Sequence, residues 1–156
     1  MSITFWDEID LILRLFAGMA AGVVVGWERT LKQQSAGIRT FGLVGLGTAT
    51  AAAIFTGDVD AASRVVQGVL TGIGFLGAGV ITLSKTRQSP KGLTTAAAIW
   101  VTAALGCAAG RGDWPILLTA TALAVLLLAI DHSVERWAGR KDGSSAADVP
   151  GPSDRR

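Results

Sequence analysis

The sequence predicts an all-α membrane protein, a bundle of five transmembrane helices with the N-terminus outside and the C-terminus cytoplasmic. Half of the 156 residues are hydrophobic, and they are gathered in blocks instead of at amphipathic spacing. Five of these blocks are long enough to cross a bilayer, which takes about 17–25 residues. Charged residues flank the blocks, and the chain has one cysteine, so that an intrachain disulfide is excluded. These observations favour a membrane bundle over a soluble domain.

The spans are expected, in chain order, at residues 11–27, 40–57, 65–84, 92–110 and 114–130. Pro115 opens the fifth span, where its missing N–H does no harm. Residues 1–138 would thus form the transmembrane domain. Residues 139–156 consist mostly of Gly, Ser, Ala, Asp and Pro and are expected to form a disordered cytoplasmic tail.

The basic residues predict the orientation, because Lys and Arg concentrate on the cytoplasmic side. Eleven fall in the first loop, the third loop and the tail: Arg29, Lys32, Arg39, Lys85, Arg87, Lys91, Arg136, Arg140, Lys141, Arg155 and Arg156. Three fall on the other side: Arg14, Arg64 and Arg111. Four tryptophans lie near span ends, as an aromatic belt requires: Trp6, Trp27, Trp114 and Trp137. The tail is therefore expected inside the cell.

The third span carries five glycines, which would weaken a soluble helix but let membrane helices approach closely. Gly68, Gly72 and Gly79 share one helical face, with Phe75 between them, and Gly74 and Gly77 lie on roughly the opposite face. We expect these glycines to be helix-packing positions and this span to be the central one, contacted from two sides.

Residues 72–77 also match G-x-G-x-x-G, the dinucleotide fingerprint. That motif requires a preceding strand, a following helix and an acidic residue about twenty positions on. Here it lies inside an apolar stretch, and the region near position 97 is Ala-Ala-Ala-Ile-Trp. Helix packing is the better interpretation.

Enzyme chemistry finds no support in the sequence. Cys107 and His132 lie at opposite ends of their spans, and no metal-ligand spacing is present. The outer acids, among them the pair Asp58 and Asp60, are interpreted as solvated loop residues. We expect no catalytic residue, no cofactor, no bound metal and no nucleic-acid partner.

Three residues within spans could form an intramembrane polar site: Arg14, Gln67 and Trp100. Arg14 is a functional candidate, as ionisable residues in membranes are, but it can also extend outward from the span end and pair with Asp10 four residues earlier. Gln67 and Trp100 need hydrogen-bond partners and are structural residues or line a pathway.

A set of polar residues is expected at the cytoplasmic ends of spans one, two and four: Glu28, Arg29, Arg39, Thr40, Thr94 and Thr95. Helix N-termini with Thr hydroxyls and a nearby Arg can bind an anion or the carboxylate of a partner. The alternative is that the threonines cap helices and the arginines only satisfy the positive-inside rule. A weak internal repeat, Gly37-Ile-Arg-Thr40 and Gly92-Leu-Thr-Thr95, marks two of these ends.

Four blocks resemble the membrane domain of the MgtC/SapB family: Gly26-Trp-Glu-Arg29, Ala36-Gly-Ile-Arg-Thr40, the glycine run 72–79, and Gly92-Leu-Thr-Thr-Ala-Ala97 with Trp100. Their order and spacing agree over about residues 10–135. The resemblance implies a multi-pass bacterial inner-membrane protein linked to growth under magnesium limitation. It also implies a regulator of other membrane proteins. The chain resembles a short member without the soluble C-terminal domain.

Three functions follow as hypotheses. The first is a regulatory or partner-binding protein in adaptation to magnesium limitation, embedded in the lipid bilayer and bound to another membrane protein or to copies of itself. The second is a small ion transporter or channel, lined by polar groups facing one another across a cavity. The third is a structural membrane scaffold.

Overall fold

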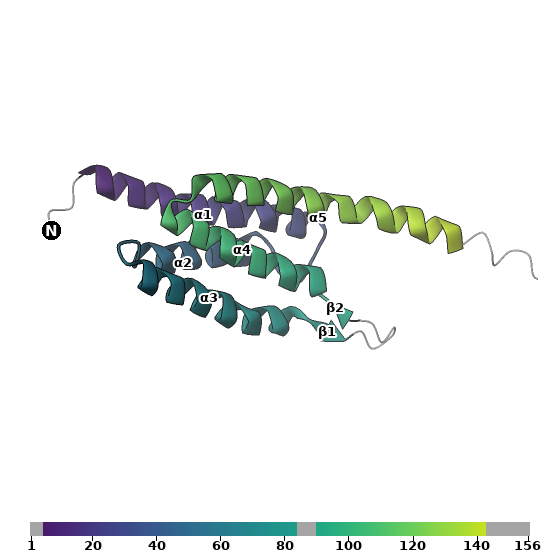
Figure 1. The fold of residues 1–156 in the computed structure, drawn as a ribbon. Coiled ribbons are helices and arrows are strands. Elements are labelled where there is room, and N and C mark those ends of the chain that lie inside the picture. Colours follow the sequence, from purple (N-terminus) through teal and green to yellow (C-terminus); the bar gives the residue numbers. More distant parts are fainter. Residues whose placement is uncertain (1–4, 84–89, 143–156) are drawn as a thin grey trace, which may run out of the picture. The chain divides into compact units, whose positions relative to one another are not determined.

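The computed structural model describes the backbone of residues 5–83 and 90–142 and the side chains of residues 5–81 and 92–130. Within them the chain forms five helices and one short strand pair (Figure 1). The elements are α1 (Phe5–Leu31), α2 (Ile38–Ala53), α3 (Val59–Val80), β1 (Thr82–Leu83), β2 (Pro90–Lys91), α4 (Leu93–Arg111) and α5 (Trp114–Asp142). β1 and β2 pair antiparallel, with Thr82 opposite Lys91. The predicted helical fold is confirmed apart from this pair of two-residue strands.

Three of the described helices are long and apolar enough to cross a membrane: α1, α3 and α4. The predicted span at 11–27 lies within α1, and the predicted span at 92–110 overlaps α4 at all but its first residue. Helix α2 has 16 residues, and the apolar part of α5, Trp114–Ile130, is similarly short. The count of five spans and the orientation of the termini therefore stay predictions.

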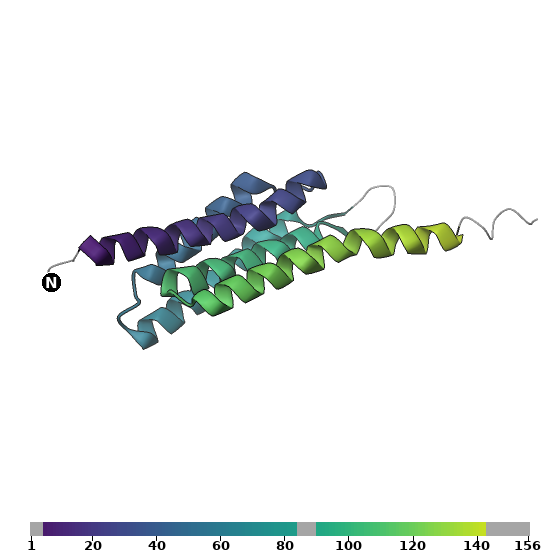
Figure 2. The same cartoon turned by 90° about the horizontal axis from the view of Figure 1, so that it is seen from above.

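Helices α1, α2 and α4 pack on one another and form the core (Figures 1 and 2). Their backbones meet at glycines, which have no Cβ to hold the helices apart. A Cβ at Gly22 would collide with the carbonyl of Phe41, and a Cβ at Gly110 would collide with that of Ala49. A Cβ at Gly18 would lie 2.7 Å from the Cβ of Ala49. Helix α2 is thus held between α1 and α4 by direct backbone contact.

The prediction that the glycine-rich third span is central is wrong. Helix α3 packs mainly against α4 and has few contacts with α2. A Cβ added at Gly68, Gly72, Gly74 or Gly79 would find no atom within 4 Å, and only Gly77 is near a neighbour among these five, 3.7 Å from Ala96. The centre is instead occupied by α2, because α1 and α4 both present four-residue glycine spacings to it.

Helix α3 begins six residues before the predicted span because Asp58 caps it. The Asp58 carboxylate accepts hydrogen bonds from the backbone N–H groups of Asp60 and Ala61, each at 3.0 Å. The helix ends at Val80, where β1 follows after one residue. The predicted end of this span at Ser84, and the basic residues Lys85 and Arg87, lie outside the described residues.

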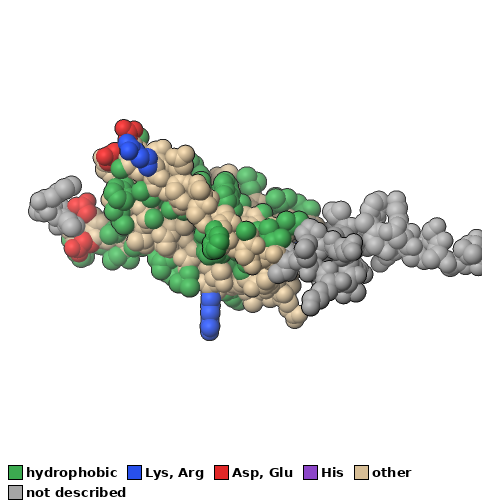
Figure 3. Space-filling view, turned by 90° about the horizontal axis from the view of Figure 1, so that it is seen from below, with side chains coloured by type: hydrophobic (Ala, Val, Ile, Leu, Met, Phe, Trp, Pro, Cys, Tyr) green, Lys and Arg blue, Asp and Glu red, His purple; other side chains and the backbone are tan. Residues whose placement is uncertain are grey.

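The chain divides into two compact units between Val125 and Leu126, so that α5 begins in the first unit and ends in the second. The second unit is helical as far as Asp142. The predicted tail therefore overlaps the helix at 139–142, and its remainder, 143–156, lies outside the described residues. On the face of the molecule in Figure 3, hydrophobic side chains are spread over the middle, and acidic side chains gather near one end.

Candidate functional site

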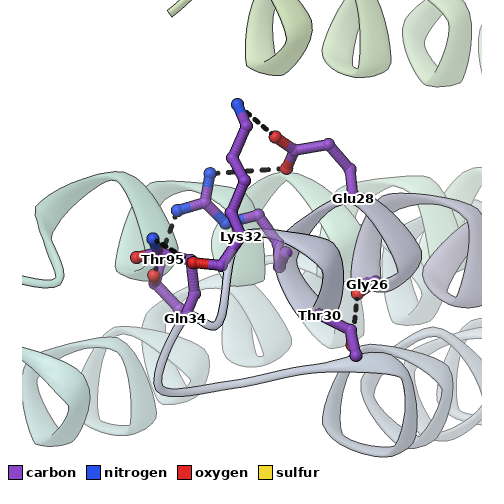
Figure 4. Close-up of polar contacts among 7 residues, drawn as sticks. Gly26, Glu28, Thr30, Lys32, Gln34 and Thr95 are labelled. Carbon is purple, nitrogen blue, oxygen red and sulfur yellow. Dashed lines mark hydrogen bonds and ion pairs between the residues drawn. The ribbon is translucent and has the colours of Figure 1, made fainter. Parts of the chain in front are cut away.

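Arg29, in the last turn of α1, is the most deeply buried charged side chain among the described residues, with 2% of its surface exposed. Its Nη2 donates to the hydroxyl of Thr95, and its Nη1 donates to Oε2 of Glu28, both at 3.4 Å. Thr95 is itself fully buried. The other oxygen of Glu28 forms an ion pair with Lys32, one turn further along α1 (Figure 4). We call these four residues, Glu28, Arg29, Lys32 and Thr95, the Arg29 cluster.

The cluster lies at the N-terminus of α4. Gly92 caps this helix in the left-handed conformation, with φ of 90°, and no side chain caps the first N–H groups. A Cβ at Gly92 would also collide with the carbonyl of Val80, so this close approach requires glycine. A helix N-terminus carries a partial positive charge and favours anions. Arg29 therefore adds a cation where the helix favours an anion.

The guanidinium of Arg29 is incompletely satisfied by the described residues. Its Nε is buried and has no hydrogen-bond partner there, and its two other contacts are at 3.4 Å. Charge-assisted hydrogen bonds of this type are usually about 2.7–2.9 Å long. A buried cation with long bonds and an unused N–H can donate a further hydrogen bond to a carboxylate or phosphate oxygen, and the helix terminus would add to that attraction.

The residues predicted to form the cytoplasmic cluster divide into two groups. Glu28, Arg29 and Thr95 come together as expected. Arg39 and Thr94 are exposed, Thr40 is half-buried, and no hydrogen bond or ion pair between described residues joins these three side chains to the Arg29 cluster. Arg39 lines a shallow groove on α1 and α2, with Met19 and Leu43 among its walls.

Lys32 is not among the residues predicted for the cytoplasmic cluster, although its spacing from Glu28 could have indicated it. It follows Glu28 by four residues, the spacing at which a Glu and a Lys meet on one helical face. The carboxylate of Glu28 is therefore shared between Lys32 and Arg29, which leaves Arg29 less fully neutralised.

Arg14 lies at the opposite end of α4. It pairs with Asp10 at 2.6 Å, as predicted from their spacing, and its Nη1 donates to the carbonyl of Gly110 at 3.5 Å. Helix C-termini carry a partial negative charge and unsatisfied carbonyls, so a cation stabilises them. Arg14 is thus a contact between α1 and the end of α4, which favours a structural role.

The possible intramembrane polar site is not assembled. Gln67 is exposed on α3, and Trp100 is 47% exposed on α4. Arg14 contacts α4 at Gly110, ten residues from Trp100, a separation of about 15 Å along the helix. These side chains do not face one another across a cavity, as a pathway would require.

No group of three or more His, Cys, Asp or Glu side chains that could hold a metal ion occurs among the described residues. Cys107 is buried in α4. The side chain of His132 lies outside the described residues.

The sequence model of the MgtC family matches residues 15–137. This chain belongs to the MgtC family. The match includes the Arg29 cluster, all of α2, α3 and α4, and most of α1. The helices long enough to span a bilayer make this MgtC-family chain a multi-pass membrane protein. No solved structure matches it.

Several curated relatives agree with this assignment. SrpB of Synechococcus elongatus is 42% identical over 146 residues, covering 85% of this chain and 80% of SrpB. MgtC of Salmonella typhimurium is 41% identical over 115 residues, covering 70% of this chain and 47% of that protein. YhiD of Escherichia coli K12 is 35% identical, covering 80% of this chain and 62% of YhiD. The chain thus spans most of SrpB but about half of MgtC.

Proposed function

We propose that this protein is a regulatory, partner-binding protein of the bacterial inner membrane that acts in adaptation to magnesium limitation. Membership of the MgtC family supports the link to magnesium, because YhiD is described as a candidate magnesium transporter. The Arg29 cluster supports the partner-binding role. By the positive-inside rule, we expect the end of α1 that carries this cluster to be cytoplasmic.

The single observation that carries the proposal is the buried, incompletely paired guanidinium of Arg29 at the N-terminus of α4. A carboxylate from a membrane partner would offset the charge of both the guanidinium and the helix terminus. Because Arg29 is nearly inaccessible in the single chain, we expect the partner carboxylate to bind as the loop between α1 and α2 shifts. Gln33 in this loop has a positive φ of 51°, which an ordinary residue adopts at a cost.

Transport of a cation is the second candidate, and it rests on the description of YhiD. The geometry favours it less, since Arg14, Gln67 and Trp100 do not converge. A transporter would also have to offer oxygen ligands to Mg²⁺, the ligands that this ion prefers.

Replacing Arg29 by Lys tests the proposal in a strain that lacks its own copy of the gene. Lysine keeps the positive charge and hence the orientation, but it cannot bind a carboxylate through two parallel N–H groups. We expect Arg29→Lys to insert at parental abundance and to fail in growth at low magnesium. The matched control is Arg39→Lys, at an exposed position outside the Arg29 cluster, which should grow as the parent does.

Thr95→Val provides a second variant that removes the hydroxyl with little change of shape. It should weaken growth at low magnesium in the same direction as Arg29→Lys. Parental growth of both variants would contradict a docking role for the cluster. Magnesium flux through the purified protein in liposomes would favour the transporter instead.

A further inference from the structure

A groove of about 390 Å³ lies between α3 and α4, toward the end of α4 that Arg14 contacts. Val66 and Leu70 of α3 form one wall, and the small residues Ala104 and Cys107 of α4 lie across from them. Arg111 and Asp113 lie at the end of the groove. None of the functions proposed above uses this groove.

The two helices are close together at one end, and toward the other end α4 presents the small residues Ala104 and Cys107 to α3. At the close end, a Cβ on Gly77 would lie 3.7 Å from Ala96. Toward the other end, the groove follows α3 from Val59 to Leu70, about 16 Å at the helical rise. Both helices are candidate membrane spans, so we expect the groove to lie along the hydrocarbon region and its charged end to lie near the headgroups.

Arg111 and Asp113 place opposite charges at this headgroup end. The Nε of Arg111 donates to Oδ2 of Asp113 at 3.1 Å, and the two side chains are 39% and 41% exposed. This bond uses one of the five N–H donors of a guanidinium and one of the two oxygens of a carboxylate. Trp114, the next residue, is partly exposed, as is common for tryptophan at a membrane interface.

We propose that the groove binds one acyl chain of a phospholipid whose headgroup is zwitterionic and carries a primary amine. The phosphate of such a lipid, phosphatidylethanolamine, would bind the remaining N–H groups of Arg111, and its ammonium would bind the carboxylate of Asp113. The two ion pairs complement the charges at the end of the groove. A volume of about 390 Å³ lies within the range of small-molecule sites, about 300–1,000 Å³.

The lining of the groove favours a lipid chain as its occupant. Apart from Ser63 and the two charged residues at its end, the groove is lined by apolar side chains of α3 and α4. Apolar walls that end at a pair of opposite charges match a hydrocarbon chain that ends at a zwitterionic headgroup.

The charge pattern also excludes the other common headgroups. Phosphatidylglycerol has no cation for Asp113, and its phosphate would be repelled by that carboxylate. Phosphatidylcholine has a cation, but its quaternary nitrogen has no N–H to donate. The lipid with the primary amine is the one of the three that satisfies both side chains with charge-assisted hydrogen bonds.

The test is native mass spectrometry of the purified full chain, titrated in detergent with dimyristoyl phosphatidylethanolamine, phosphatidylcholine or phosphatidylglycerol. We expect one phosphatidylethanolamine to be retained about tenfold more strongly than the others, the effect of one charge-assisted hydrogen bond. Equal retention of the three lipids would overturn the proposal.

Two variants separate the headgroup contact from the acyl-chain contact. Asp113→Asn should remove the preference for phosphatidylethanolamine and raise retention of phosphatidylglycerol, because Arg111 then faces the phosphate without a competing carboxylate. Ala104→Phe should fill the groove and abolish retention of a lipid.

The matched control is Ala97→Phe, at an exposed position seven residues earlier on α4 and outside the groove, which should bind as the parent does. Retention of the lipid by Ala104→Phe would overturn the proposal, as would a parental lipid preference in Asp113→Asn. A lipid-free dimer that Ala104→Phe dissociates would identify a second copy as the occupant and would also overturn it. Asp113→Asn, an exposed and conservative change, decides the question if Ala104→Phe fails to fold.

Discussion

Helices α1 and α3 look alike in sequence, and they behave differently in the fold. Each is apolar and each carries glycines four residues apart: Gly18, Gly22 and Gly26 in α1, and Gly68 and Gly72 in α3. The three glycines of α1 all lie against α2, whereas a Cβ at either of the two glycines of α3 would meet no atom within 4 Å.

This difference shows that glycines four residues apart leave one face of a helix without side chains, but they do not ensure that another helix packs on that face. Helix α1 meets α2 where α2 also has glycines, so that the backbones approach from both sides. Gly45 is the clearest case, because a Cβ there would collide with the carbonyl of Gly18. Among the described residues, no helix packs against the face of α3 that carries Gly68 and Gly72. Phe75 on that face is 89% exposed.

The strongest test of this contrast is Gly22→Ala. The added Cβ would collide with the backbone of Phe41, which can move only if α2 moves as well. Overpacking of this kind usually costs about 1–3 kcal/mol and occasionally more, and we expect this variant at or above the upper end. Thermal unfolding in detergent and abundance in membranes would measure the loss.

Gly47→Ala is the matched control for that experiment, since Gly47 is in α2 and a Cβ there would meet no atom within 4 Å. It should unfold at or slightly above the parental temperature, because alanine is the better helix former. A normal melting temperature for Gly22→Ala would show that α1 and α2 are further apart than described.

Gly106→Ala should have a large but smaller effect. Its Cβ would collide with the hydroxyl oxygen of Thr48 and approach the carbonyl of Gly45 to 2.6 Å. The Thr48 side chain can be removed, whereas the carbonyl cannot. We therefore expect Thr48→Ala to recover part of the stability that Gly106→Ala loses, and a double-mutant cycle of unfolding free energies measures the coupling. Strictly additive free energies would contradict this contact.

Arg14→Gln should cost less. The variant loses the ion pair with Asp10 and weakens the contact with the carbonyl of Gly110 at the end of α4, which together are worth about 1 kcal/mol. Arg64 on α3 is exposed and provides the matched control, so that Arg64→Gln should change the unfolding temperature less. If the two variants unfold alike, Arg14 does not anchor α4.

Gly72→Leu is expected to have the smallest effect. Its side chain would enter open space in the single chain, and substitutions at such sites usually change stability by about 0.5 kcal/mol or less. Parental melting in detergent would sharpen the contrast with Gly22. A large loss of stability would mean that another molecule covers the glycine face of α3.

The apolar part of each helix was predictable because charges interrupt the apolar blocks, although α1, α3 and α5 extend beyond those charges. The Arg29 cluster was partly predictable because topology brings the ends of α1 and α4 to one face. The sequence could not show that Arg39 is outside the cluster, since this depends on the rotation of α2 against α1. It could not show the partner of Arg14 either, because a backbone carbonyl, such as that of Gly110, has no sequence signature. The error over α3 came from treating glycine content as evidence of contact, although α1 carries the regular spacing Gly18, Gly22 and Gly26.

The two buried or half-buried arginines of α1 each have a carboxylate on their own helix, Asp10 for Arg14 and Glu28 for Arg29. During synthesis α1 is complete long before α4 leaves the ribosome, so neither Gly110 nor Thr95 is yet available to it. The local carboxylates let a helix with two guanidinium groups enter the bilayer with both charges partly paired before α4 is made. Loss of Asp10 or Glu28 would then reduce the yield of inserted protein as well as the stability of the molecules that do insert.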